Sequence, residues 1–121
     1  MTFPRITYNY NDLDEARALT DVIETKFSSL TKYFHENQTV TCDVEFVKIP
    51  AQQNGPIHTL RVNLIVDGTL FRAEATEESF EQSIDEARAE LDKELRRSKD
   101  KQATLHKQAG REAKEKMLEA E

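Results

Sequence analysis

The fold is decided by the segment of residues 73–101, AEATEESFEQSIDEARAELDKELRRSKDK. Its apolar residues recur at intervals of three and four, which places them on one face of a helix at ~100° per residue. These residues are Phe80, Ile84, Ala87, Leu91 and Leu95. Thr76 stands before this run, where an N-cap is expected. The segment therefore predicts a strand end, a cap at Thr76 and a long amphipathic helix through Lys101.

A second amphipathic helix is predicted near the N-terminus, after a short β-prone stretch at residues 5–10. Asn11 and Asp12 offer N-cap chemistry at its start. The apolar positions that follow share one face of a helix of about six turns; they are Ala16, Leu19, Ile23, Phe27, Leu30 and Phe34. Both predicted helices need an apolar surface to cover.

The residues between the helices predict that surface. Residues 39–48 alternate in character, with Val40, Cys42, Val44 and Phe46 on one face of a strand. Residues 57–66 and 69–75 form two further strands around Asp67-Gly68, a strong signal for a two-residue hairpin turn. This turn predicts apolar pairs on one face: Val66–Thr69, Leu64–Phe71, Val62–Ala73 and Leu60–Ala75. It predicts mostly polar pairs on the other: Ile65–Leu70, Asn63–Arg72 and Arg61–Glu74.

Because only one face of the sheet is apolar, both helices should cover the same side. The predicted order is β-α-β-β-β-α, a two-layer α+β domain with a four-stranded sheet. Residues 1–101 form this single domain. Residues 102–121 are a charged C-terminal tail, either a helical extension or disordered.

The composition narrows the function classes. No apolar run approaches the ~20 residues of a membrane span, and the N-terminus lacks a secretory h-region. The lone cysteine, Cys42, fits a reducing cytoplasm. Cys42 also points inward, the histidines are scattered, and no glycine-rich phosphate loop is present. We therefore expect no enzyme, metal site, cofactor or small-molecule substrate.

Charge is unevenly distributed along the chain. The net charge is −6, but residues 1–92 carry 8 Lys and Arg against 17 Asp and Glu, whereas residues 93–101 carry 5 against 2. Lys93, Arg97 and Lys101 are spaced by four and so share one ridge of the helix. This ridge is suited either to phosphate neutralisation or to a solvated helix C-terminus with favourable cations.

Three strings resemble one protein family. They are Leu30-Thr31-Lys32-Tyr33-Phe34, the run from Asp67-Gly68 through Phe71-Arg72-Ala73-Glu74-Ala75, and Glu78-Ser79-Phe80-Glu81-Gln82-Ser83-Ile84-Asp85. Their order and spacing over residues 5–101 resemble the ribosome hibernation-promoting factor and ribosome-associated inhibitor family, also called σ54 modulation proteins. With only about 20 residues after the core, the chain resembles the short type.

The resemblance implies a fold like that of the double-stranded RNA-binding domain. It also implies a translation inhibitor that binds the small ribosomal subunit through 16S rRNA and occludes the tRNA and mRNA sites. The implied RNA-binding residues are basic side chains of both helices: Lys26, Lys32, Lys93, Arg96, Arg97, Lys99 and Lys101. The chain departs from the family at Glu90 and Asp92, where members are often basic. We expect the free protein to be a monomer.

An alternative belongs to another functional class. The acidic body would suit a protein-interaction module that has kept the fold, lost the RNA site and binds a basic partner. Digestion of RNA separates the two hypotheses, because only the protein complex would survive it.

Overall fold

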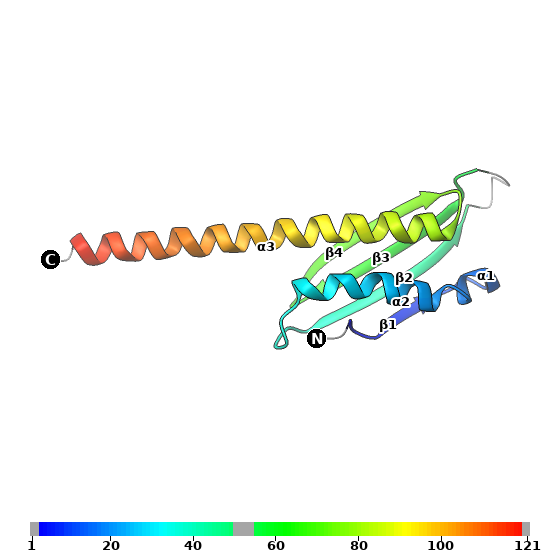
Figure 1. The fold of residues 1–121 in the computed structure, drawn as a ribbon, viewed down its shortest axis with the longest axis horizontal. Coiled ribbons are helices and arrows are strands. Elements are labelled where there is room, and N and C mark those ends of the chain that lie inside the picture. The colour runs from blue at the N-terminus through cyan, green and yellow to red at the C-terminus, as the bar shows by residue number, and fades with distance from the viewer. Residues whose placement is uncertain (1–2, 50–54, 120–121) are drawn as a thin grey trace.

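A four-stranded sheet covered on one face by helices forms the body of the protein (Figure 1). The computed structural model describes residues 3–49 and 55–119, with side chains described through residue 102. The elements are β1 (Ile6–Asn9), α1 (Asp14–Arg17), α2 (Thr20–Phe27), the 3₁₀ helix η1 (Ser28–Tyr33), β2 (Val40–Lys48), β3 (His58–Val66), β4 (Thr69–Glu77) and α3 (Phe80–Glu119). The strand order is β1-β2-β3-β4, with β1 parallel to β2 and the other pairs antiparallel. The predicted α+β fold is confirmed.

The hairpin between β3 and β4 has the predicted register. Val66 pairs with Thr69, and the antiparallel register continues without a break to the pair of His58 and Glu77. Asp67 and Gly68 both have positive φ angles, 49° and 84°, as a turn that follows the right-handed twist of two strands requires. On the open face of the sheet, the Arg61 guanidinium lies 3.2 Å from the Glu74 carboxylate.

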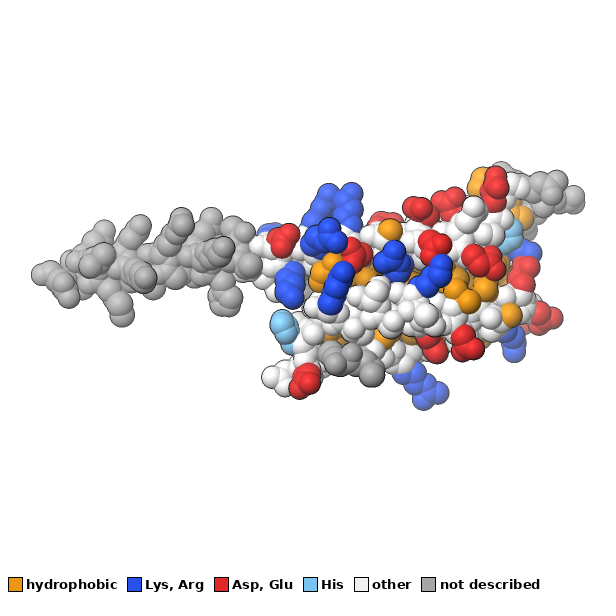
Figure 2. Space-filling view, viewed as in Figure 1, with side chains coloured by type: hydrophobic (Ala, Val, Ile, Leu, Met, Phe, Trp, Pro, Cys, Tyr) orange, Lys and Arg blue, Asp and Glu red, His pale blue; other side chains and the backbone are white. Residues whose placement is uncertain are grey.

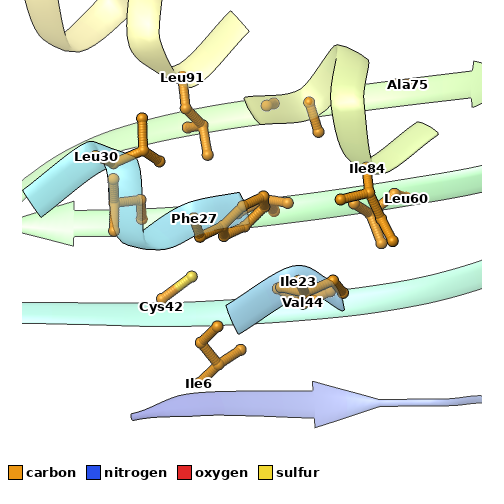
Figure 3. Packing of buried hydrophobic residues seen from close by; sticks show 14 of the residues in the cluster. Ile6, Ile23, Phe27, Leu30, Cys42, Val44, Leu60, Ala75, Ile84 and Leu91 are labelled. Atoms are coloured by element: carbon orange, nitrogen blue, oxygen red, sulfur yellow. The ribbon is translucent and has the colours of Figure 1, made fainter. Parts of the chain in front are cut away.

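The core lies between the helices and the inner face of the sheet. Figure 3 shows Ile84 of α3 beside Leu60 of β3, and Leu91 of α3 on the side of Leu30; all belong to one cluster of buried residues. The apolar residues predicted to share the inner face of α3 are all buried: Phe80, Ile84, Ala87, Leu91 and Leu95. Burial of this stripe fixes the rotation of α3 about its axis, and with it the direction of the other described side chains on the helix.

The predicted cap at Thr76 is wrong. β4 extends through Glu77, and the Thr76 hydroxyl hydrogen-bonds the Thr59 hydroxyl across the β3–β4 pair at 2.7 Å. Ser79 performs the capping instead, because its hydroxyl oxygen accepts a hydrogen bond from the Gln82 amide at 3.2 Å. Strand pairing therefore holds Thr76 in the sheet and delays the start of the helix to Phe80.

The predicted six-turn first helix is also wrong, because the segment is divided into α1, α2 and η1. Hydroxyl side chains donate to carbonyls three residues back, which competes with regular helical bonding. The donors are Thr20, Ser28, Ser29 and Thr31. Neither Asn11 nor Asp12 caps the segment: both have positive φ angles, and the Asn11 amide donates to the Phe46 carbonyl at 2.7 Å.

The last helix is longer than the domain that it covers. α3 contains 40 residues, and Figure 1 shows its C-terminal part projecting well beyond the sheet. The backbone of the predicted tail is therefore helical through Glu119, while residues 120–121 lie outside the described part. A domain boundary at residue 101 remains a prediction.

Leu91 offers a direct test of the core. Its side chain is fully buried between α3 and the sheet, so Leu91→Ala should lower the free energy of unfolding by about 2–5 kcal/mol in urea titrations. Leu70 is 52% exposed, and Leu70→Ala should change stability by less than about 0.5 kcal/mol. Equal effects of the two substitutions would show that the core is wrongly placed.

Candidate nucleic-acid interface

Two ion-pair clusters join the first helical segment to α3. We call this line of contact, where α2 and η1 lie beside α3, the interhelical seam. Near its beginning, Lys26 of α2 forms an ion pair with Asp85 of α3. Further along, Tyr33 of η1 donates a hydrogen bond of 2.8 Å to Asp92 of α3. The seam therefore fixes the first helical segment against one side of α3.

Asp92 is the centre of the second cluster. Its carboxylate lies 2.9 Å from the Arg96 guanidinium and 3.7 Å from the Lys32 ammonium, and its side chain is only 18% exposed. The hydrogen bond from Tyr33, followed by the charges of Lys32 and Arg96, lowers the pKa of Asp92 below its ordinary value. One carboxylate thus holds two of the predicted RNA-binding cations in place and offsets part of their charge.

The other flank of α3 lies beside β4 and bears a different set of charges. A groove between β4 and α3 is lined by Lys93 together with five glutamates: Glu74, Glu77, Glu86, Glu90 and Glu94. Arg97 and Lys101 follow Lys93 at intervals of four and therefore share its flank. Lys93, Arg97 and Lys101 thus lie away from the seam that contains Lys26 and Lys32.

The predicted cations differ in how far they are already neutralised. Lys26, Lys32 and Arg96 are paired with aspartates, and Arg97 lies 3.5 Å from Glu94. Among described side chains, the remaining three form no ion pair within 4.0 Å; they are Lys93, Lys99 and Lys101. All three are exposed. These three side chains are therefore the cations best able to meet an external anion.

The basic side chains gather toward the end where α3 leaves the sheet. Figure 2 shows Lys and Arg side chains over the helical layer at this end, with Asp and Glu more frequent toward the start of α3. Lys99 belongs to this end and borders a hollow that is also lined by Tyr33 and His35. The helical layer is therefore electrostatically polarised along its length.

Sequence reasoning missed Arg88. This half-buried arginine lies three residues after Asp85 and four before Asp92, so it projects from the seam side of α3. No ion pair to Arg88 within 4.0 Å is found among the described side chains. Arg88 precedes Arg96 by eight residues and Lys99 by eleven, so the three share one side of the helix. This spacing is the sequence signal that could have identified Arg88 as a candidate.

Cys42 and the tyrosines have the following positions. Cys42 is buried, and burial raises the pKa of its thiol to about 12, so the thiol is neutral near pH 7. The Tyr10 ring stacks on the rings of Tyr8 and Phe46, with centroid distances of 5.5 and 5.8 Å.

Within the described residues, no cluster of three metal-ligating side chains is found. Nor is any described helix long and apolar enough to cross a membrane.

Comparison with known proteins adds a family and a fold. The family model described as Sigma 54 modulation protein / S30EA ribosomal protein matches residues 6–103. No curated protein sequence is significantly similar to the chain. The Thermus thermophilus Protein Y N-terminal domain aligns with a TM-score of 0.60 and 18% identity, over 80% of this chain and 98% of that one. A ribosomal subunit interface protein from Coxiella burnetii aligns with a TM-score of 0.58 and 16% identity, over 78% and 96%.

Acid titration tests the role of Asp92. Because the folded-state pKa is lowered, the stabilisation from Asp92 is complete above the pKa of the unfolded chain, near 4, and is lost as pH falls through the folded-state pKa. Asp92→Asn should therefore be less stable than the parent at pH 6, and the gap should shrink as pH falls toward 3 in urea unfolding. Glu81→Gln serves as the charge-matched control on the same helix. A stability gap between the parent and Asp92→Asn that does not change with pH would contradict the assignment.

Proposed function

The chain belongs to the sigma 54 modulation protein / S30EA ribosomal protein family, a family of ribosome-associated factors, and from this premise we propose that it binds the small ribosomal subunit and holds it inactive. The partner is 16S rRNA, contacted through the helical layer. Because the proposed partner is the ribosome, we expect the activity in the cytoplasm. The observation that carries the proposal is the family match combined with the concentration of basic side chains at residues 93–101.

The unpaired cations supply the binding energy. Lys93, Lys99 and Lys101 are exposed and have no internal carboxylate within ion-pair distance among described side chains. A cation of this kind releases condensed counterions from RNA when it meets a phosphate. A cation already paired with a carboxylate must first give up that partner, so its net gain is smaller. The affinity for RNA therefore depends mainly on residues 93–101 of α3, where the helix reaches the end of the sheet.

The paired cations have a positioning role in this proposal. Lys32 and Arg96 are held by Asp92, and Lys26 by Asp85. These contacts join α2 and η1 to α3, so that the basic residues of two chain segments face the RNA as one rigid surface. Phosphate contacts of this type fix the orientation of a protein on RNA and read little sequence.

Inhibition in this proposal is steric and involves no chemical step. A folded body bound in the channel of tRNA and mRNA excludes those ligands by occupying their space. Tight phosphate contacts are needed only to keep the body there, and the acidic remainder of the surface limits non-specific binding to other RNA.

Single substitutions distinguish unpaired from paired cations. Lys99→Ala and Lys93→Ala should each weaken binding to small subunits and lower the slope of log affinity against log salt by about one unit. Lys32→Ala should lower the slope less, because Asp92 already offsets its charge. Lys48→Ala is the matched control, since Lys48 pairs with Glu15 on α1 and should leave binding unchanged. Co-sedimentation in sucrose gradients at a series of salt concentrations measures these effects.

Two outcomes would count against the proposal. Absence of co-sedimentation with small subunits at low salt would contradict it outright. An association that survives complete RNA digestion would instead favour the protein-interaction module with an acidic body.

A further inference from the structure

The edge of the sheet at β4 has no strand partner among the described residues. β4 pairs with β3 over nine residues without interruption, and no strand in the described part of the chain pairs with its other edge. The opposite edge strand, β1, has only four residues and follows Pro4. Long edge strands are usually blunted by charged side chains, above all lysine, by proline or by a bulge. β4 has no lysine, proline or bulge, and its charged side chains are Arg72, Glu74 and Glu77.

The register identifies which backbone groups are available. Val66 and Thr69 close the two-residue turn as a hydrogen-bonded pair, and such pairs alternate along an antiparallel ladder. Alternate residues from Leu70 to Thr76 therefore direct their N–H and C=O groups away from β3. Among described residues, these groups have no other backbone hydrogen-bond partner. They form a row of donors and acceptors at the spacing of an additional strand.

The groove beside this edge determines what an additional strand would meet. Its volume is about 460 Å³, and its lining includes Ala75 of β4 and Ala89 of α3. Their small side chains leave room next to the strand. Its charged lining consists of five glutamates against one lysine, Lys93. Around Glu86 and Glu90, away from Lys93, RNA would be repelled, whereas a basic polypeptide would be attracted.

The spacing of the glutamates matches an extended chain. Glu86, Glu90 and Glu94 recur every four residues, which corresponds to ~6 Å along a helix. Alternate residues of a strand point to the same side at intervals of ~6.6 Å. A strand added to β4 would therefore place every second side chain opposite one of these glutamates. Glu94 already lies 3.5 Å from Arg97, so the strongest contacts should involve Glu86 and Glu90.

We propose that β4 is a docking edge for an extended basic peptide segment of a partner protein, which adds as a fifth strand and places alternate Lys or Arg side chains against Glu86 and Glu90. Backbone hydrogen bonds provide the affinity and the glutamates provide selectivity, as in other cases of strand addition. This surface borders Lys93 but does not include Lys99 or the seam, and it can be tested without ribosomes.

The first experiment uses fluorescence anisotropy with a labelled peptide as long as β4, in which lysine alternates with threonine. It should bind the full chain more tightly than a peptide of the same composition whose lysines are consecutive. Glu86→Gln/Glu90→Gln should weaken binding of the alternating peptide about tenfold. Glu78→Gln/Glu81→Gln removes the same charge outside the groove and should leave binding unchanged. Equal affinity for the two peptides, or equal effects of the two double variants, would overturn the proposal.

The second experiment tests the backbone contacts and needs no change to the protein. Two versions of the alternating peptide carry N-methyl groups on alternate backbone nitrogens, one on the even and one on the odd positions. Only one set can face β4, so one peptide should lose binding and the other should keep it. Equal affinities, high or low, would overturn the proposal. A concentration-dependent dimer that the peptide cannot displace would assign the edge to a second copy of the chain and also overturn it.

Discussion

The packing of the apolar stripe of α3 against the sheet determines where the charges of this protein lie. Because Ile84 and Leu91 are completely buried, α3 cannot rotate, and the residues on its two flanks face different surroundings. Asp85 and Asp92 turn toward α2 and η1. Glu90 and Lys93 turn toward β4. A single hydrophobic constraint thus separates a positively charged end, a paired seam and an acidic groove on one helix.

The meaning of the acidic residues depends on that separation. Asp92 places a negative charge among the candidate RNA-binding cations, and by charge alone it would weaken RNA binding. In the structure it accepts a hydrogen bond from Tyr33 and pairs with Arg96, so it joins η1 to α3. Glu90 forms no such link and remains on the β4 flank. Two acidic residues that look alike in sequence therefore have different physical consequences.

Local patterns predicted the fold well because the decisive signals were local. Asp67-Gly68 and the alternation around it specified the β3–β4 register, including the Arg61–Glu74 pair. The start of α3 was misplaced because Thr76 and Ser79 are both good capping residues, and only the distant partner Thr59 decides between them. The breaks between α1, α2 and η1 depend on hydroxyl-to-carbonyl bonds, which compete with a helical pattern that is otherwise sound. The pairing of candidate cations with carboxylates could not be predicted from local sequence either, because Lys26 and Asp85 are 59 residues apart.

In the proposed complex, the helical layer faces ribosomal RNA with its basic end. A density map of the chain bound to the small subunit tests this most directly. We predict that Lys93, Lys99 and Lys101 lie within contact distance of phosphates, that Asp92 still joins Tyr33 to Arg96, and that the open face of the sheet points away from the RNA. A map in which the open face, around Arg61 and Arg72, lies against the RNA while the helices face solvent would contradict it.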